Sequence, residues 1–226
     1  MNNNTLFLKT TADGSHTLLL PEMNEHYHSV NGAVQESIHV YLEAGFNQCR
    51  KSEIRVLEMG FGTGLNALLT AIAAEHQKIK VVYTGLEKFP LPQEIINRLN
   101  YSEIPAIKGS TSNLLFQSIH QVNWGKLVSI NPYFMLEKIQ TDFREFNFPD
   151  KYDVVYYDAF APDKQPEVWS QELFDNIFSA MNQGGIITTY CAKGISRRML
   201  QQAGFSVERI PGPPGKREML RGKVLD

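Results

Sequence analysis

Apolar and polar positions along this chain change repeatedly between a strand pattern and a helix pattern. Short apolar runs end in glycine, proline or acidic residues, and longer segments with apolar residues three or four apart follow them. The predicted strands are 54–57, 80–86, 134–140, 152–157, 186–190, 207–210 and 217–220, and the predicted helices are 34–44, 65–74, 92–100, 110–122, 170–181 and 196–203. This alternation predicts an α/β fold with a mainly parallel, seven-stranded sheet whose last strand is antiparallel.

The first 50 residues predict an extension packed on the main domain. Leu6–Lys9 and Thr17–Leu20 flank Asp13-Gly14, which is the pattern of a β-hairpin. The polar stretch 25–29 predicts a loop on the substrate side, followed by the helix 34–44. Residues 51–226 form the main domain, because no linker, internal repeat or low-complexity segment divides them.

Composition indicates an ordinary globular protein of 226 residues, with 42% hydrophobic and 20% charged residues. Two cysteines suit a reducing compartment and provide neither a disulfide framework nor a zinc cluster, so we expect no metal. No apolar run reaches membrane-spanning length, and the start Met1-Asn2-Asn3-Asn4 is unlike a secretory signal. We therefore expect a cytoplasmic protein that does not act at a membrane.

Charge is distributed unevenly along the chain. The net charge is only -2, but residues 191–226 carry eight lysines and arginines against three acidic residues. Such asymmetry points to a surface that faces a polyanion, and a solvated surface helix and hairpin is the alternative.

The strongest chemical signal is the junction between the strand 54–57 and the helix after it. Glu58-Met59-Gly60-Phe61-Gly62-Thr63-Gly64 fills this junction, as in the opening unit of a nucleotide-binding α/β sheet. A dinucleotide motif requires Gly-x-Gly-x-x-Gly, and here Leu65 stands where its third glycine belongs. The spacing Glu-x-Gly-x-Gly-x-Gly instead resembles the first motif of class I S-adenosyl-L-methionine (SAM)-dependent methyltransferases.

Acidic residues also follow three later strands. Glu87 ends the second strand and is placed to bind ribose hydroxyls. Asp142 and Phe143 follow the third strand, where they would border an adenine or, alternatively, form a helix cap and a core contact. Asp158 ends the buried strand 152–157, and ligands of parallel sheets bind beyond such ends, so we expect it to face the cofactor or the reacting group.

Several segments taken together resemble one family. They are Glu58 to Asn66, Glu87-Lys88-Phe89-Pro90, Asp158 to Pro162 with Pro166-Glu167 and Trp169, and Lys216-Arg217-Glu218-Met219-Leu220. In this order they are similar to the methyltransferase domain of the bifunctional bacterial enzyme that completes 5-methylaminomethyl-2-thiouridine at the tRNA wobble position. Asp13 to Thr17, His28-Ser29 and Gln35-Glu36-Ser37 look similar to stand-alone members of that family.

The resemblance implies a Rossmann-like class I fold, SAM as cofactor, and N-methylation of 5-aminomethyl(-2-thio)uridine in the anticodon stem-loop of tRNA. Asp158 is the implied catalytic residue, beside the transferred methyl group. The expected cofactor-binding residues are Glu58, Met59, Gly60, Gly62, Gly64, Asn66, Glu87, Lys88, Asp142, Phe143 and Asp158. Because the chain ends directly after the last motif, we expect no flavin and no oxidase activity, so that a separate oxidase or precursor-forming enzyme supplies the substrate.

The expected substrate-binding residues are aromatic or basic. Tyr27 or Phe160 would stack on the unpaired base, with Pro162 nearby. The basic residues expected to contact phosphates are Lys193, Arg197, Arg198, Lys216 and Arg217.

Three other functions remain open from the sequence. A SAM-dependent transferase, of methyl or aminopropyl groups, could act on a small-molecule amine. A catalytically inactive RNA-binding module could share the fold, since fold does not determine function. A nicotinamide oxidoreductase is disfavoured by Leu65 in the glycine spacing.

Overall fold

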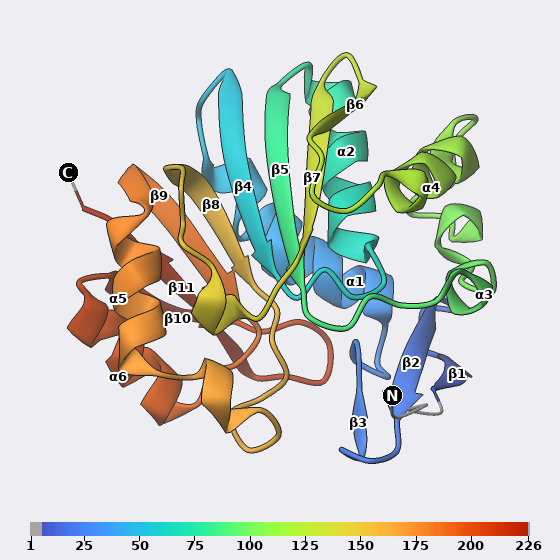
Figure 1. Ribbon diagram of the computed structural model, residues 1–226. Helices are drawn as coiled ribbons and strands as arrows, with labels where there is room; N and C mark the ends of the chain where they lie inside the picture. The colour runs from blue at the N-terminus through green and yellow to red at the C-terminus, as the bar shows by residue number, and fades with distance from the viewer. Residues whose placement is uncertain (1–5, 226) are drawn as a thin grey trace.

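The computed structural model describes residues 6–225, so the asparagine-rich start and Asp226 lie outside the described residues. Within them, eight strands form one central sheet (Figure 1). Across the sheet the order is β10 (Ser206–Pro211), β11 (Glu218–Lys223), β9 (Met181–Thr189), β8 (Tyr152–Tyr157), β4 (Glu53–Met59), β5 (Lys80–Glu87), β7 (Phe134–Gln140) and β6 (Val128–Asn131). The middle block from β9 to β7 is parallel, whereas β6, β10 and β11 pair antiparallel with their neighbours.

The seven predicted strands are all present, and the antiparallel finish is confirmed by the pairing of β11 with β9. β6 is an addition that the sequence pattern did not predict, since it is short and mostly exposed at the sheet edge. The buried run of β8 lies in the middle of the sheet, with all six residues buried, as its apolar sequence predicts.

Helices cover both faces of the sheet (Figure 1). One face is covered by α1 (Ala33–Ser37), the π-helical turns η1 (Ile38–Glu43), α2 (Leu65–Gln77) and α4 (Ser112–Gln121), which share one hydrophobic core. The other face is covered by α5 (Gln171–Ser179) and α6 (Gly194–Ala203), which share a second core. The remaining helical elements are α3 (Gln93–Ile96) and the single turns η2 (Phe46–Gln48), η3 (Tyr101–Glu103), η4 (Phe143–Glu145) and η5 (Pro166–Val168).

The N-terminal residues form a small sheet of their own. β1 (Phe7–Thr10) and β2 (His16–Leu20) make the predicted hairpin, and β3 (Glu25–His26) adds a third strand. The stretch 25–29 is therefore not entirely a loop, because its first two residues pair with β2. This small sheet lies below the carboxyl ends of the central strands in Figure 1.

The prediction of one helix was wrong at its C-terminal end. The helix expected over 170–181 stops at Ser179, and Gly184 and Gly185 lie inside β9 instead of ending the helix. A side chain on Gly185 would approach the Asn182 carbonyl oxygen to 2.7 Å, where the pairing of β8 with β9 shifts register. A glycine that looks like a helix end thus serves a β-bulge.

Two further segments are less helical than predicted. Only Gln93–Ile96 is helical within the expected helix 92–100. The helix expected from 110 begins at Ser112, and Ser110 is not its cap. Instead, the Ser112 hydroxyl donates a hydrogen bond to the Ile107 carbonyl oxygen, which ties the helix start to the preceding turn.

Candidate active site

The glycine loop between β4 and α2 brings two strand ends together. Gly60 has φ 104°, and a Cβ there would lie 2.6 Å from the Asp158 carbonyl oxygen. Gly64 has φ 71°, and a Cβ there would meet the His120 ring at 2.9 Å. Only glycine allows both the left-handed backbone and these approaches. Gly60 therefore sets the distance between β4 and β8, whereas Gly64 serves the packing of α2 on α4.

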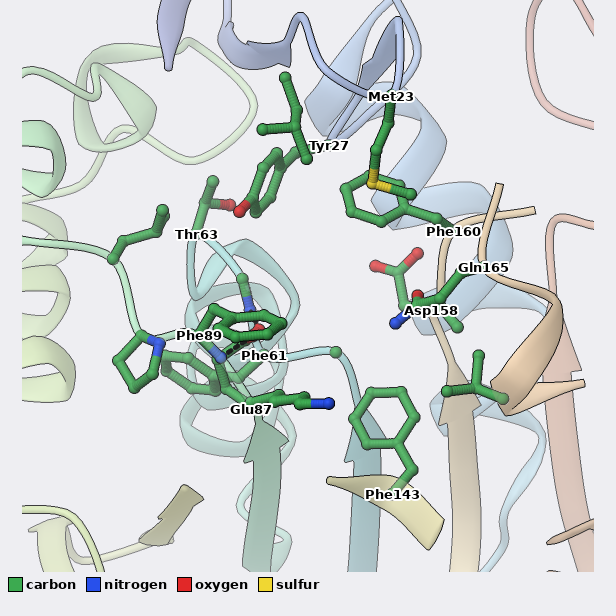
Figure 2. Close-up of a pocket in the computed structure, with 18 of the residues that line it drawn as sticks. Met23, Tyr27, Phe61, Thr63, Glu87, Phe89, Phe143, Asp158, Phe160 and Gln165 are labelled. Atoms are coloured by element: carbon green, nitrogen blue, oxygen red, sulfur yellow. Dashed lines mark hydrogen bonds between the residues drawn. The ribbon is translucent and has the colours of Figure 1, made fainter. Parts of the chain in front are cut away.

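A cavity of about 930 Å³ opens at the carboxyl ends of β4, β5, β7 and β8 (Figure 2). This is the position that a parallel sheet offers to a ligand. The sequence-predicted residues that line it are Tyr27, Gly60, Gly62, Asn66, Glu87, Lys88, Asp142, Phe143, Asp158 and Phe160. They come from the N-terminal segment and from four strand ends, so the fold assembles one site from residues up to 133 positions apart.

Asp158 lies on the cavity wall and is held by two donors. Its Oδ1 accepts a hydrogen bond from the Tyr41 hydroxyl at 2.5 Å, and its Oδ2 accepts one from Asn66 Nδ2 at 2.9 Å. Each carboxylate oxygen keeps another acceptor position, because a carboxylate accepts about four hydrogen bonds. The structure therefore presents a fixed acceptor to the cavity.

Burial raises the pKa of Asp158 to about 7, and the negative charge of Glu36 acts in the same direction. The hydrogen bonds from Tyr41 and Asn66 and the positive charge of Lys216 lower this pKa and so limit the rise. A carboxyl group with such a pKa exchanges a proton near neutral pH, which is the property of a group that takes up a proton during a reaction.

Asn66 connects Asp158 to a buried acid. Its Nδ2 also donates to Glu58 Oε1 at 2.9 Å, and Glu58 has no exposed surface. Burial raises the pKa of Glu58 well above its usual value, because a charged carboxylate is costly without water around it. Glu58 does not line the cavity, and it can act on a ligand only by orienting Asn66. Met59, also predicted to bind the cofactor, is fully buried in the core.

Glu87 is held by backbone groups. Its Oε2 accepts from the Gly62 N–H at 2.9 Å and its Oε1 from the Phe89 N–H at 2.8 Å. Burial raises the pKa of Glu87, and these backbone donors oppose the rise. The carboxylate lines the cavity where hydroxyl groups of a nucleoside would find an acceptor.

Asp142 and Phe143 follow β7 and line the cavity together. Asp142 caps the turn η4, and its two oxygens accept four hydrogen bonds, three from Arg144 and one from Lys88 at 2.8 Å. These bonds, first of all those from the Arg144 side chain, hold the pKa of Asp142 well below its usual range. An adenine amine would find a free acceptor on Asp142 only after Lys88 moved away. Phe143 keeps an apolar ring on the wall.

Two aromatic rings lie next to one another at the cavity, and one of them, Phe160, is close to Asp158 (Figure 2). Tyr27 and Phe160 make an edge contact, with ring centroids 5.4 Å apart. A Cβ on Gly62 would lie 3.2 Å from the Tyr27 ring, so the N-terminal segment packs directly on the glycine loop. The two rings give this part of the cavity an apolar surface that suits a flat base.

The predicted basic residues are not brought together at the cavity. Lys193 forms an ion pair with Asp163, and Lys216 Nζ lies 2.7 Å from Glu36 Oε1. Arg217 is exposed, Arg197 is half-buried with its Nε unpaired, and Pro162 does not line the cavity. The charge of Lys216 is thus already paired inside the protein, which differs from the phosphate contact that we expected of it.

Three residues that the sequence analysis did not assign are part of the site. Tyr41 donates to Asp158, and Glu36 lies behind it. His28 lines the cavity, has an unpaired Nδ1 and is kept neutral because burial lowers its pKa to about 4. Tyr41 lay in a predicted helix without any distinguishing pattern, whereas Glu36 and His28 stood in segments noted for their resemblance alone.

Within residues 6–225, no helix is long and apolar enough to cross a bilayer. Among the same residues, no group of three or more His, Cys, Asp or Glu side chains is arranged to hold a metal ion.

Comparison with known proteins assigns the fold and the cofactor. Residues 116–224 match the model of a family described as S-adenosyl-L-methionine-dependent methyltransferase. The crystal structure of MnmC2 from Aquifex aeolicus superposes with a TM-score of 0.77 and 25% identity, over 99% of this chain and 72% of that one. The chain has the fold of the class I SAM-dependent methyltransferases.

Several curated relatives of this chain share one name. The tRNA 5-methylaminomethyl-2-thiouridine biosynthesis bifunctional protein MnmC of Leptospira interrogans is 28% identical over 215 residues, which are 91% of this chain and 33% of that protein. The protein of the same name from Methylobacillus flagellatus is 30% identical over 209 residues, or 87% of this chain and 32% of the relative. The methyltransferase thus spans about a third of the length of these relatives.

The residues of this methyltransferase fit SAM. Asn66 has a buried Oδ1 without a partner among the described residues, and the carboxylates of Glu87 and Asp158 line the cavity. SAM carries a positively charged sulfonium, an ammonium group and two ribose hydroxyls, and these groups require such acceptors. Gly60 and Gly62 line the cavity, and because they have no side chain the protein backbone there can approach the cofactor closely.

Proposed function

We propose that this methyltransferase N-methylates 5-aminomethyl(-2-thio)uridine at the wobble position of tRNA, giving 5-methylaminomethyl(-2-thio)uridine. The observation that carries the proposal is a fixed acceptor, Asp158, at a cavity that also holds two apposed aromatic rings. The similarity over about nine-tenths of the chain to proteins named for 5-methylaminomethyl-2-thiouridine biosynthesis supports this substrate. The enzyme would act in the cytoplasm, where its tRNA substrate is.

Bound SAM supplies an electrophilic methyl group, and the protein has to supply position and a suitable field. An alkyl amine titrates near the lysine value of about 10.4 and attacks only when it is neutral. Asp158 would accept a hydrogen bond from the amine, orient its lone pair and take up a proton. Its pKa of about 7 lets it be anionic before the transfer and hold a proton afterwards.

Tyr27 and Phe160 would bind the wobble base after it leaves the anticodon stack. In Figure 2 the Phe160 ring lies near Asp158, whereas the Tyr27 ring packs on the glycine loop at Gly62. Gly60, Gly62, Asn66 and Glu87 would hold the cofactor, with Phe143 against its adenine.

Exposed basic groups would bind the phosphates of the anticodon stem-loop. Arg198 and Arg217 are exposed, and Lys193 has an exposed ion pair that phosphate can replace. Binding of this kind weakens steeply with salt, because each neutralised phosphate releases counterions. Another enzyme or route would form the aminomethyl precursor.

The test uses purified protein, SAM with a labelled methyl group, and tRNA from cells blocked at the aminomethyl-uridine stage. Label in 5-methylaminomethyl(-2-thio)uridine after digestion is the expected result. Asp158→Asn should lower the transfer rate about 10²- to 10⁴-fold while SAM still binds. Asp175→Asn is the matched control, because Asp175 is exposed on α5 and accepts only from Gln171. Label on added small amines but not on tRNA would refute the RNA substrate and favour a small-molecule transferase.

A further inference from the structure

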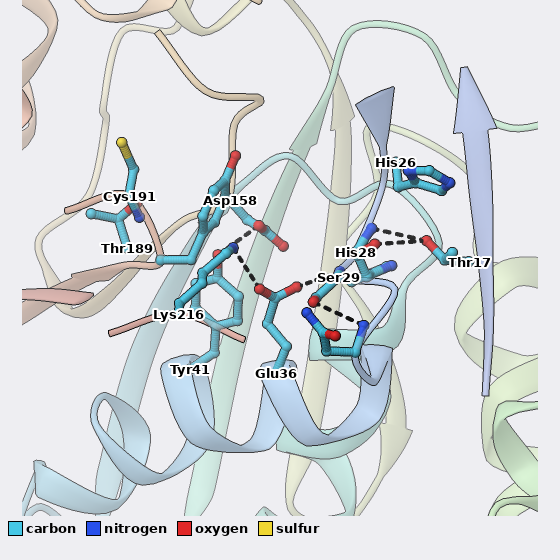
Figure 3. A network of polar contacts seen from close by, with 12 residues as sticks. Thr17, His26, His28, Ser29, Glu36, Tyr41, Asp158, Thr189, Cys191 and Lys216 are labelled. Carbon is cyan, nitrogen blue, oxygen red and sulfur yellow. Dashed lines mark hydrogen bonds and ion pairs between the residues drawn. The ribbon is translucent and has the colours of Figure 1, made fainter. Parts of the chain in front are cut away.

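A partly buried ion pair between Lys216 and Glu36 lies behind the candidate acceptor (Figure 3). Lys216 Nζ is 2.7 Å from Glu36 Oε1, and Glu36 Oε2 accepts a hydrogen bond from the Ser29 N–H at 2.7 Å. The Glu36 side chain is only 7% exposed. The two residues are 180 positions apart, so the pair joins the N-terminal segment to the loop between β10 and β11.

The pair also contacts the chain next to Asp158. Lys216 Nζ lies 3.8 Å from the centre of the Tyr190 ring, and the Tyr190 hydroxyl donates to the Ala159 carbonyl oxygen at 3.0 Å. On the other side, Glu36 is one turn before Tyr41 in the helical segment that presents the Tyr41 hydroxyl to Asp158. The pair is therefore connected to both sides of the acceptor.

Burying a charge is expensive unless it is well paired. Glu36 meets that condition, because it accepts from a cation and a backbone N–H, and the partly exposed Lys216 has both a carboxylate and an aromatic face beside it. A cation held in this way is poorly placed to bind phosphate. Its positive charge instead lowers the pKa of Asp158.

We propose that Glu36 and Lys216 are positioning residues that hold the Tyr41–Asp158 contact. Asp158 is then a competent acceptor only when the N-terminal segment that carries Tyr27 is docked on the domain. The catalytic role of this pair rests on the proposed function, since the amine that would donate a hydrogen bond to Asp158 belongs to the substrate proposed above. Ser29 is two residues after Tyr27, so the hydrogen bond from Ser29 to Glu36 fixes the segment that presents the aromatic ring.

The opposite signs of the pair make its role measurable. Glu36 raises the pKa of Asp158 and Lys216 lowers it. The titratable and polar groups that interact with Asp158 are Tyr41 from η1, Asn66 from α2, Glu58 from β4, Glu36 from α1, Lys216 before β11, Tyr190 after β9, Tyr83 from β5 and Tyr101 from η3. Among these, Glu36 and Lys216 form an ion pair with one another, and either can be replaced by a neutral residue without touching the Asp158 carboxylate itself.

The test measures the titration of Asp158 by carbon-13 NMR in protein with labelled aspartate, with Asp158→Asn identifying the signal. Glu36→Gln should lower the pKa of Asp158 and Lys216→Met should raise it, each by about one pH unit. Lys216→Arg keeps the charge and should leave the titration within about 0.3 units. The double variant leaves no unpaired buried charge, so it should fold if a single variant does not.

Activity supplies the second readout. In Glu36→Gln and Lys216→Met, kcat should fall about tenfold or more, the SAM dissociation constant should change less than about threefold, and the acid limb of the pH–rate profile should follow the NMR titration. Arg209→Met is the matched control, because Arg209 pairs with Glu218 on the exposed side of the same hairpin and should change neither readout.

An unchanged Asp158 titration in folded Glu36→Gln and Lys216→Met would overturn the proposal, whatever their activity. The NMR measurement needs neither tRNA nor turnover, so it remains decisive if tRNA proves not to be the substrate. If the wild-type protein transferred no methyl group to tRNA but the variants showed the expected titration shifts, the proposed function would be refuted. The positioning role of Glu36 and Lys216 would still stand.

Discussion

Gly60→Ala tests whether the glycine loop sets the distance between β4 and β8. The new Cβ would lie 2.6 Å from the Asp158 carbonyl oxygen and 3.2 Å from its carbon. Both atoms are backbone, so no side-chain rotation relieves the contact. Two costs add: about 1–3 kcal/mol for alanine at φ 104° and about 1–3 kcal/mol for the overpacking.

Gly14→Ala is the matched control for the backbone part of this cost. Gly14 has φ 83°, and an added Cβ there meets no atom within 4 Å. Its expected cost is about 1–2 kcal/mol of left-handed strain, reduced slightly because alanine restricts the unfolded chain. The difference between the two variants therefore isolates the contact with Asp158, which we expect to destabilise the fold by about 2 kcal/mol.

Thermal unfolding of both variants measures this difference. For a chain of this size about 2 kcal/mol corresponds to a Tm lower by roughly 4–8 °C in Gly60→Ala than in Gly14→Ala. The same displacement of Asp158 should lower methyl transfer by about 10²-fold, since a shift near 1 Å is enough for such a loss. Equal Tm values within about 1 °C, with full activity of Gly60→Ala, would refute the reasoning.

Three further predictions concern single groups. Tyr41→Phe removes a donor that lowers the pKa of Asp158, so the acid limb of the pH–rate profile should move to higher pH; an unmoved limb would contradict the contact. Asp153→Ala removes a buried carboxylate that accepts from the Arg55 N–H, Asn182 and the half-exposed Lys51, and chemical denaturation should show a loss of about 2 kcal/mol, whereas a loss below about 1 kcal/mol would argue against it. Burial lowers the pKa of Lys138 to about 8, so the unfolded chain binds more protons between pH 8 and 10.5. The stability of the wild type relative to Lys138→Met should therefore rise across that window; a flat difference would show that Lys138 is not perturbed.

Local pattern was sufficient to predict the parallel sheet, because its strands are continuous apolar runs bounded by glycine or acidic residues. β8 is the clearest case, since it is buried on both faces and its sequence has no polar alternation. Local pattern was misleading at Gly184 and Gly185, where the pair lies in a bulged strand and not at a helix end. The choice between these two uses of glycine depends on the neighbouring strand, which local sequence does not show.

The site was predictable where it follows from topology. Glu87 ends β5 and Asp158 follows β8, and these two parallel strands lie on either side of β4. The carboxyl ends of parallel strands meet at one edge of the sheet, which predicts that both residues line one cavity. Tyr41 and Glu36 were not predictable in this way, because they reach Asp158 from an N-terminal helix whose docking depends on tertiary packing. For Lys216 the sequence shows a positive charge but not its buried partner.

The place of β11 in the sheet has a consequence for biosynthesis. β11 is the last strand along the described chain, yet it lies between β9 and β10. While the ribosome is still adding this strand, the edge of β9 that pairs with β11 is open. An open edge next to a buried parallel strand invites aggregation, so nascent chains of this protein should need chaperone protection until residue 223 has emerged. The central sheet therefore stays incomplete until β11 has emerged, and chains that stop before Glu218 are expected to be removed as misfolded products.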